Sequence, residues 1–240
     1  MQGLIFDIKE FALNDGGGIR STVFFKGCPL RCVWCHNPEG LSPKRELYVK
    51  QKGCLHCGLC RKPCSHPDCQ GLGRCLHICP KNLVSVAGVE WESGALAEKL
   101  LRQTDIYRET GGGVTLSGGE PLLQWQFAAE LLDRLHGRGH TAIETSGYAE
   151  AEAFRAVIDR CDFVYMDLKL MDYEKHKTYT GVSNDRILQN AEYLKASGKP
   201  HTFRTPLIPN ITDTEENLAA IRAFVGDDSW EQLPYNTLAP

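Results

Sequence analysis

Short apolar runs rich in β-branched and aromatic residues recur along the chain, and helical patterns separate most of them. The strand candidates are RSTVFF (20–25), GVTLSG (113–118), HTAIETSG (140–147), DFVYMDLK (162–169), HTFRTPLI (201–208) and EQLPYN (231–236). Apolar residues recur at helical spacing in residues 122–137, 151–160, 186–198 and 214–226. This alternation predicts a parallel sheet with helices outside it, and six strands predict a partial (β/α)6 barrel of α/β class. Such a barrel binds its ligands at the carboxyl ends of its strands.

One segment, residues 47–85, does not follow this alternation. It contains seven of the eleven cysteines, many glycines and prolines, and almost no periodic apolar face. A segment of this composition cannot bury a core of its own and must be held together by metal. We therefore predict a discontinuous barrel, residues 1–46 and 86–240, interrupted by a small metal-binding insert, residues 47–85.

Composition narrows the classes of protein that remain. The 240 residues are 42% hydrophobic and 24% charged, as in an ordinary globular protein. A net charge of −3 gives no basic field, so we expect neither a nucleic-acid nor a membrane partner. The N-terminus lacks the features of a signal peptide, and no apolar run approaches the ~20 residues that span a bilayer. We expect a cytoplasmic protein, whose clustered cysteines bind metal rather than form disulfides.

The cysteines of the insert follow the spacing of bacterial ferredoxins. The first run, C-x2-C-x2-C-x3-C, consists of Cys54, Cys57, Cys60 and Cys64. In such a run the fourth cysteine holds the other cluster of a two-cluster protein. Counting back from Cys79 gives Cys75 and Cys69, with Leu72 where the second cysteine of the second run would stand. This register predicts a complete iron–sulfur cluster and an incomplete one. Their ligands are Cys54, Cys57, Cys60 and Cys79 for the first, and Cys64, Cys69 and Cys75 for the second.

The incomplete cluster leaves its composition open. Three thiolates hold either a three-iron cluster or a four-iron cluster with one unusual ligand. His66, Asp68 and His77 are the candidates for that ligand, and the sequence does not choose among them. Zinc is the competing metal, because C-x2-C pairs also build tetrahedral zinc sites. Seven cysteines on a two-cluster register suit zinc poorly. Cys161 stands apart from all ten others, and we expect it to be a small buried residue of the core.

Three further cysteines, Cys28, Cys32 and Cys35, follow the first strand candidate with C-x3-C-x2-C spacing. A barrel would present them at its open end. Three thiolates on a four-iron, four-sulfur (4Fe-4S) cluster leave one iron free to bind the amine and carboxylate of a substrate. Short motifs need context. Here the context is SGGE (117–120), which ends the next strand candidate, and DLK (167–169), which ends a later one.

These motifs together resemble the radical S-adenosylmethionine (SAM) superfamily. The resemblance implies that the Gly-Gly-Glu segment supports the methionine amino group, and that an aromatic residue before the third cysteine lies beside the adenine. It also implies that the Asp-x-Lys segment contacts the methionine carboxylate and the ribose. The SAM-binding residues implied in this way are Trp34, Cys35, His36, Gly118, Gly119, Glu120, Asp167, Leu168, Lys169 and Asn236.

The resemblance extends over the whole chain and narrows to the glycyl-radical-enzyme activating enzymes, such as pyruvate formate-lyase activating enzyme. NDGGGIRSTVFFKGCPLRCVWCHNPEG (14–40) resembles the N-terminal signature of that family, with Gly17 where a proline is usual. A subset of the family carries a two-cluster insert at this place. RTPLIPNITDTEEN (204–217) and LPYN (233–236) resemble its later strands, although relatives have a histidine at the position of Asn236. Relatives usually continue for several tens of residues past LPYN, so we expect this chain to be truncated.

Two further roles follow from the same resemblance. Glu144 and Thr145, in ETSG (144–147), could hold a monovalent cation together with Asp167. Arg204 is a candidate to hold the incoming loop of a partner protein, although a surface or helix-pairing arginine is an equally good interpretation.

The resemblance implies an oxidoreductase that acts on another protein. A reduced cluster of low potential passes one electron to SAM, which yields methionine and a 5′-deoxyadenosyl radical. The radical removes a Cα hydrogen from one glycine of a large glycyl-radical enzyme. The cofactor does this chemistry, so no side-chain general base is required. A ferredoxin or flavodoxin would supply the electron, and the insert would relay it or shape the docking surface. We expect the enzyme to be a monomer.

Two alternatives remain open at this point. The first is a radical SAM enzyme that acts on a small molecule or a peptide. Peptide-modifying members, however, usually carry their auxiliary clusters after the barrel. The second is a ferredoxin-like electron carrier, which would leave SGGE, DLK and the three-cysteine loop without a purpose. The sequence does not identify the glycyl-radical enzyme or its reaction.

Overall fold

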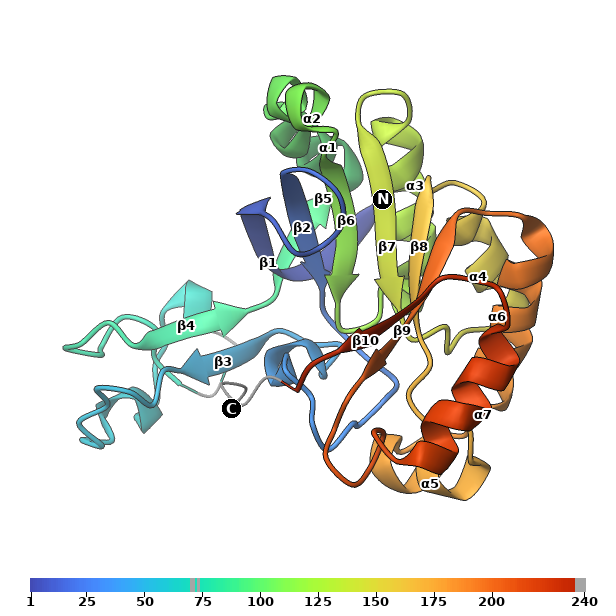
Figure 1. The fold of residues 1–240 in the computed structure, drawn as a ribbon. Helices are drawn as coiled ribbons and strands as arrows, with labels where there is room; N and C mark the ends of the chain where they lie inside the picture. The colour runs from blue at the N-terminus through green and yellow to red at the C-terminus, as the bar shows by residue number, and fades with distance from the viewer. Residues whose placement is uncertain (70–71, 73, 236–240) are drawn as a thin grey trace.

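The computed structural model describes residues 1–69, 72 and 74–235 (Figure 1). Its strands are β1 (Gln2–Ala12), β2 (Arg20–Phe25), β3 (Glu46–Val49), β4 (Val84–Ala87), β5 (Val89–Glu92), β6 (Gly113–Gly118), β7 (His140–Thr145), β8 (Phe163–Asp167), β9 (His201–Pro206) and β10 (Trp230–Leu233). Its α-helices are α1 (Ser93–Leu101), α2 (Thr104–Thr110), α3 (Trp125–Leu135), α4 (Ala151–Ile158), α5 (Tyr173–Thr180), α6 (Asp185–Ser197) and α7 (Glu215–Val225). Short 3-10 turns lie at Pro38–Gly40, Leu59–Arg61, Pro67–Cys69 and Pro121–Gln124.

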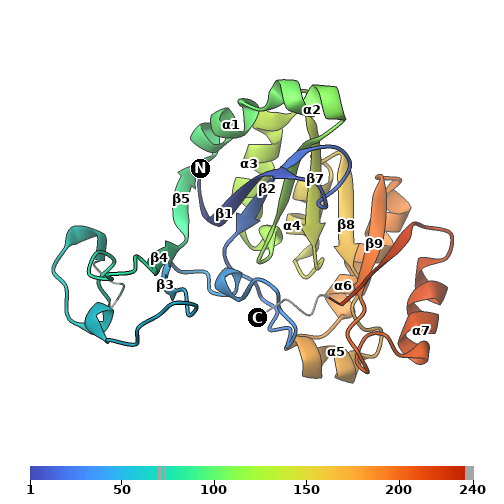
Figure 2. The ribbon, with the colours of Figure 1, turned by 60° about the vertical axis from the view of Figure 1, so that its left-hand side comes forward.

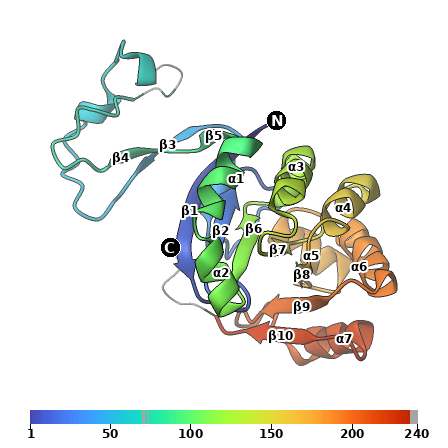
Figure 3. The same ribbon diagram turned by 90° about the horizontal axis from the view of Figure 1, so that it is seen from above.

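The main sheet has the strand order β10-β9-β8-β7-β6-β2-β1-β5. The run from β2 to β10 is parallel throughout, whereas β1 pairs antiparallel with both β2 and β5. Seen from above, the strands form an open arc with α3, α4, α6 and α7 on its outer side (Figure 3). The six predicted strands and the four predicted helices are therefore confirmed, and so is the partial α/β barrel.

The two faces of the parallel strands differ in chemistry because side chains alternate along a strand. The outer face is apolar and packs against the helices in one core; its buried members include Val114, Leu116, Ile143, Val164, Met166 and Phe203. The alternate positions are polar and bond to one another across the inner face, as Ser117 does with Glu144 at 2.6 Å. Helices thus cover the apolar outer side of the open arc, and polar groups lie on its inner side.

Several elements had no clear signal in the sequence. β1 and β5 extend the sheet beyond β2, and the pairing of Gly3 with Trp91 joins residues that precede and follow the insert. α5 has few apolar residues and buries mainly His176 and Thr180. Its start is fixed instead by Asp172, whose carboxylate accepts a hydrogen bond from the Lys175 amide at 2.7 Å. Local capping, rather than an apolar stripe, defines this helix.

The cysteine-rich insert projects from the barrel (Figures 1 and 2). β3 and β4 pair antiparallel at its base, with Glu46 opposite Ala87 and Val49 opposite Val84. Between these strands, within the described residues, the secondary structure consists of two 3-10 turns, Leu59–Arg61 and Pro67–Cys69. The ladder lies near the predicted boundaries at residues 47 and 85. The domain division and the ferredoxin-like character of the insert stay predictions.

Candidate functional site

The three-cysteine loop after β2 is held in place from two sides. On one side, the amides of Arg31 and Val33 donate to the carbonyls of Thr180 (2.7 Å) and Tyr179 (3.1 Å) at the end of α5. On the other side, the Glu120 amide donates to the Gly27 carbonyl at 2.8 Å. The ends of β2 and β6 and the last turn of α5 therefore fix the loop, which places the cysteines at the carboxyl end of the sheet.

A cavity of about 400 Å³ opens beside this loop. Twelve of the residues singled out in the sequence line it: Cys28, Cys32, Trp34, Cys35, His36, Gly118, Gly119, Glu144, Thr145, Asp167, Lys169 and Arg204. They come from the ends of β2, β6, β7, β8 and β9, the edge at which a parallel barrel binds ligands. The volume lies within the range of cavities that hold small molecules and cofactors. Folding thus brings the separate motifs of the sequence to one place.

The Gly-Gly pair at the end of β6 has a steric reason. A Cβ atom on Gly118 would lie 2.5 Å from the Phe25 amide nitrogen, and one on Gly119 would lie 2.3 Å from the Gly27 carbonyl oxygen. Gly118 also has a φ of +107°, in a region that favours glycine. Only glycine therefore lets β6 end against the cysteine loop and expose its backbone to the cavity.

Two of the described residues assigned to SAM, Glu120 and Leu168, do not line the cavity. Glu120 is 1% exposed; its carboxylate accepts hydrogen bonds from Thr145 Oγ1 (2.6 Å) and from the amide and hydroxyl of Ser146 (2.8 and 2.5 Å). It braces the β6 end against the β7 end, and its SAM-binding role stays a prediction. Leu168 is 2% exposed within the apolar core. Asn236 lies outside the described residues.

Burial and neighbouring charges shift the pKa values of the thiols in the cysteine loop. Burial raises the pKa of the Cys28 thiol to about 12, and the Glu120 carboxylate adds to this rise. Burial also raises the pKa of Cys32, against the opposing effect of Lys169. Thiols of this kind become thiolates when a metal displaces their protons. The three cysteines carry no disulfide, and soft sulfur ligands suit iron–sulfur clusters, so the residues present fit such a cluster.

Asp167 and Lys169 form an ion pair at the wall of the cavity. Burial alone would lower the pKa of Lys169, but the Asp167 carboxylate and the sulfur of Cys32 outweigh burial and raise it. The ammonium group therefore stays charged beside the cysteines. A carboxylate and an ammonium side by side match the charged amine and carboxylate of an amino acid, so these two residues also fit SAM.

A second group of charged residues lines the same cavity. Arg204 Nη1 lies 2.7 Å from Glu144 Oε1, and Arg204 Nε lies 2.9 Å from Glu231 Oε2. The guanidinium also stacks 3.7 Å from the centre of the Tyr165 ring. Burial raises the pKa of Glu144, whereas Ser117 and Arg204 oppose that rise. The sequence assigned no role to Ser117, which lies in the SGGE motif, or to Glu231, which lies in the last strand candidate.

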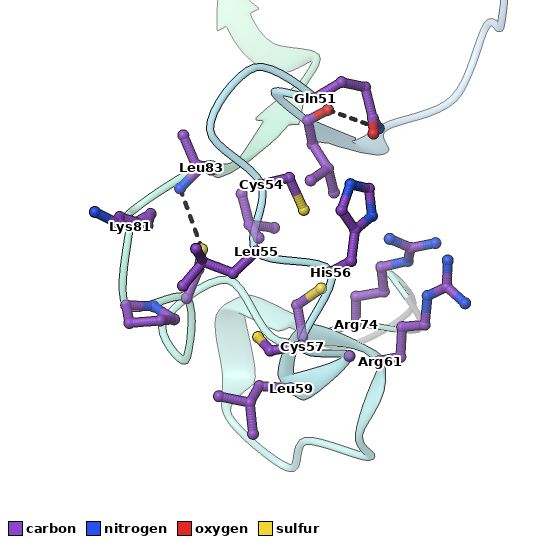
Figure 4. Close-up of a pocket in the computed structure, with 16 residues that line it drawn as sticks. Gln51, Cys54, Leu55, His56, Cys57, Leu59, Arg61, Arg74, Lys81 and Leu83 are labelled. Atoms are coloured by element: carbon purple, nitrogen blue, oxygen red, sulfur yellow. Dashed lines mark hydrogen bonds between the residues drawn. The ribbon is translucent and has the colours of Figure 1, made fainter.

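The cysteines of the insert lie at two places, and their assignment to two clusters stays a prediction. Cys54, Cys57, Cys60 and Cys79 line a second cavity of about 340 Å³, along which Arg61 and Arg74 also extend (Figure 4). The Leu83 amide donates to Cys79 Sγ at 3.4 Å. The sulfur atoms of Cys64, Cys69 and Cys75 lie within 4.8 Å of one another.

Cys161 lies apart from all of these cysteines. It is 2% exposed, and its thiol donates to the Ile158 carbonyl at 3.4 Å. Its expected burial in the core is confirmed.

Comparison with known proteins places the chain in a family. The sequence model of the radical SAM superfamily matches residues 22–221. The chain belongs to the radical SAM superfamily. It is 37% identical to the 4-hydroxyphenylacetate decarboxylase activating enzyme of Clostridium scatologenes, over 97% of this chain and 81% of that protein. It is 36% identical to the isethionate sulfite-lyase activating enzyme of Nitratidesulfovibrio vulgaris, over 98% of this chain and 85% of that protein. Within the superfamily, the chain belongs to the glycyl-radical-enzyme activating enzymes.

A solved structure supports the fold of this radical SAM protein. Streptococcus suis SuiB, bound to the precursor peptide SuiA, shares the fold with a TM-score of 0.56. The match covers 87% of this chain and 37% of SuiB at 14% identity, so it bears on the fold alone. Across residues 1–69, 72 and 74–235, none of the helices has the length and apolar character to cross a membrane.

Proposed function

We propose that this radical SAM protein activates a glycyl-radical enzyme, with a 4Fe-4S cluster on Cys28, Cys32 and Cys35 and SAM in the adjoining cavity. The observation that carries the proposal is the shared cavity, in which the three thiols meet Trp34 and the Asp167–Lys169 pair. When bound, the cluster supplies one electron to SAM, and the resulting 5′-deoxyadenosyl radical takes a hydrogen from a glycine Cα.

The chain's own residues bind and orient the cofactors in this proposal. Lys169 neutralises the methionine carboxylate, and Asp167 faces the ribose region. The backbone of Gly118 and Gly119 receives the amino group. Trp34, whose ring centre lies 6.5 Å from that of Tyr179, covers the adenine and limits the access of water. Glu120 acts indirectly, by holding Thr145 and Ser146 in place through its hydrogen bonds.

The inner wall of the cavity has two further proposed roles. Glu144, Thr145 and Asp167 line it together and are the proposed ligands of a monovalent cation. The Arg204 guanidinium competes for the Glu144 carboxylate at 2.7 Å. Arg204 is 9% exposed and bonded on two sides, so we propose that it shapes the wall against which the glycine loop of the partner docks.

The insert has a proposed role in electron transfer. A complete cluster on Cys54, Cys57, Cys60 and Cys79 would accept electrons from a ferredoxin or flavodoxin and pass them to the barrel. The shared cavity of these four thiols supports this role. In the double variant Cys54→Ala/Cys57→Ala, flavodoxin should then reduce the cluster on Cys28, Cys32 and Cys35 more slowly than in the wild type. An unchanged reduction rate would exclude the relay.

The experiment that tests the main proposal uses reconstituted enzyme, dithionite and SAM, with candidate glycyl-radical enzymes as protein substrates. We expect 5′-deoxyadenosine and methionine in equal amounts, and the doublet of a glycyl radical in the partner's electron paramagnetic resonance (EPR) spectrum. Cys32→Ala should abolish both, and Cys161→Ala should abolish neither. Cleavage of SAM without a radical in any such partner would refute the proposed protein substrate, and no cleavage would refute the chemistry.

A further inference from the structure

The second ferredoxin run of the insert lacks one cysteine, and the structure shows where that position lies. Leu72 stands at the missing cysteine. It lines a groove together with Leu47 and Val49 of β3, separate from the Cys64, Cys69 and Cys75 thiols. The three thiols therefore have no fourth partner from that position. Among the described residues, the other potential ligands grouped with one of these cysteines are His66 and His77.

Two imidazoles lie beside one of these thiols, that of Cys69. His66, Cys69 and His77 form a second group whose nitrogen and sulfur atoms lie within 4.8 Å of one another, and Cys69 belongs to both groups. The centres of the two rings lie 4.4 Å apart, and their planes are tilted by 58°. His66 follows Cys64 by two residues and His77 follows Cys75 by two, so both approach the shared Cys69 from the flanking ligands. Four other potential ligand side chains thus lie around the Cys69 sulfur atom.

Asp68 lies beside both histidine rings. Its Oδ2 atom lies 3.5 Å from His66 Nδ1 and 3.6 Å from His77 Nε2. A histidine that binds metal commonly uses its second ring nitrogen to contact a carboxylate, which fixes the tautomer and the orientation of the ring. Both imidazoles lie in one group with Cys69, whereas Asp68 does not, so the geometry favours the two histidines over the carboxylate as ligands.

We propose that an imidazole of the His66–His77 pair is the fourth protein ligand of the iron–sulfur cluster held by Cys64, Cys69 and Cys75, and that Asp68 orients it. The proposal rests on the assignment of an auxiliary cluster to these cysteines. The surroundings of Cys69 suit a ligand: its side chain is buried, and Cys69 Sγ accepts a hydrogen bond from the Leu76 amide at 3.4 Å.

The proposed ligand changes the redox role of this cluster. A neutral imidazole in place of a thiolate removes one negative charge, and replacement of cysteine by histidine raises the potential of iron–sulfur centres. The cluster should therefore have a higher midpoint potential than the four-thiolate cluster on Cys54, Cys57, Cys60 and Cys79. It would accept electrons readily and pass them to SAM only with difficulty.

The test uses the full-length variant Cys28→Ser/Cys32→Ser/Cys35→Ser, which keeps only the insert's clusters, labelled with 15N-histidine. Pulsed EPR of the reduced protein should show a 15N coupling of a directly bound imidazole. His66→Gln or His77→Gln should remove that coupling and lower the midpoint potential. His56→Gln is the matched control, because His56 lines the cavity of the other cluster. Asp68→Asn should keep the coupling but release iron to a chelator about tenfold faster.

Four results would overturn the proposal. They are the absence of histidine coupling, coupling that survives both single substitutions, a three-iron signal without histidine coupling, and one equivalent of zinc in place of iron. Zinc is the sharpest competitor, because sulfur ligands of a single tetrahedral ion lie close together at Zn–S bonds of about 2.3 Å. SAM cleavage by the wild-type enzyme is measured in parallel. Its failure would bear on the proposed function, whereas the nitrogen coupling does not depend on it.

Discussion

Arg204 and Glu144 form an ion pair of 2.7 Å that spans β8 on the inner face of the barrel. Both side chains are largely buried, 11% and 24% exposed, so the charge of each depends on the other. Arg204→Gln should lower the free energy of unfolding by about 3 kcal/mol, because it leaves a buried carboxylate without its partner. Urea unfolding measures this change. Arg108→Gln breaks an exposed pair with Asp105 and should change nothing measurable, so equal effects of the two variants would contradict the prediction.

Gly119 should not tolerate a methyl group, because a Cβ atom would lie 2.3 Å from the Gly27 carbonyl oxygen. We expect Gly119→Ala to lower the free energy of unfolding by about 2 kcal/mol and to weaken SAM binding. Gly94→Ala is the control; its nearest neighbour would be a flexible arginine at 3.6 Å, so its stability should be unchanged or about 0.5 kcal/mol higher. A fully stable Gly119→Ala variant with normal SAM affinity would show that the strand end can shift.

The free energy of unfolding should depend on pH through the protonation of Glu120. Burial raises its pKa, whereas its hydrogen bonds with Ser146 and Thr145 oppose the rise. The folded chain therefore holds the Glu120 proton to higher pH than the unfolded chain, and this contribution to stability is lost as pH rises from about 4.5 through the folded pKa. Urea unfolding at several pH values, in one cluster state, should show a smaller fall for Glu120→Gln than for wild type. Parallel curves would contradict the prediction.

The start of α5 should control the iron at the cysteine loop from a distance. Asp172→Ala removes the cap of α5, at a cost of about 1 kcal/mol, and the end of α5 holds the loop through the Tyr179 and Thr180 carbonyls. We expect faster release of iron from this loop to a chelator. Thr214→Ala removes the corresponding cap of α7, which accepts from the Asn217 amide at 3.3 Å. Equal release rates from both variants would mean that α5 does not support the loop.

Cys161 should be dispensable for metal. Its thiol is buried, and burial raises its pKa to about 12. Cys161→Ala should keep the iron content of wild type and lose about 1 kcal/mol of stability. Cys79→Ala should lose iron, because Cys79 lines the cavity of the complete cysteine set. Chemical iron analysis checks both variants, and a loss of iron in Cys161→Ala would place that thiol among the ligands.

The sequence by itself determined the repeating parts of this protein. The six parallel strands and four of the helices follow from local periodicity, which reports the face that each segment buries. The spacing of the insert's cysteines predicts which thiols share a cluster, because short intervals between ligands restrict which thiols can meet, and this assignment stays a prediction. Cys28, Cys32 and Cys35 were predictable for the same reason.

Only the tertiary structure decided the relations between distant segments. β1 and β5 join the sheet through pairing across the whole insert, and α5 depends on a cap and on its contact with the cysteine loop. The burial of the Glu120 carboxylate depends on the fold, because it bonds to Thr145, at the end of β7, and to Ser146, which follows β7. Arg204 meets Glu144 for a similar reason. Such contacts depend on which strand ends are neighbours, and strand order is a property of the folded sheet that no local pattern encodes.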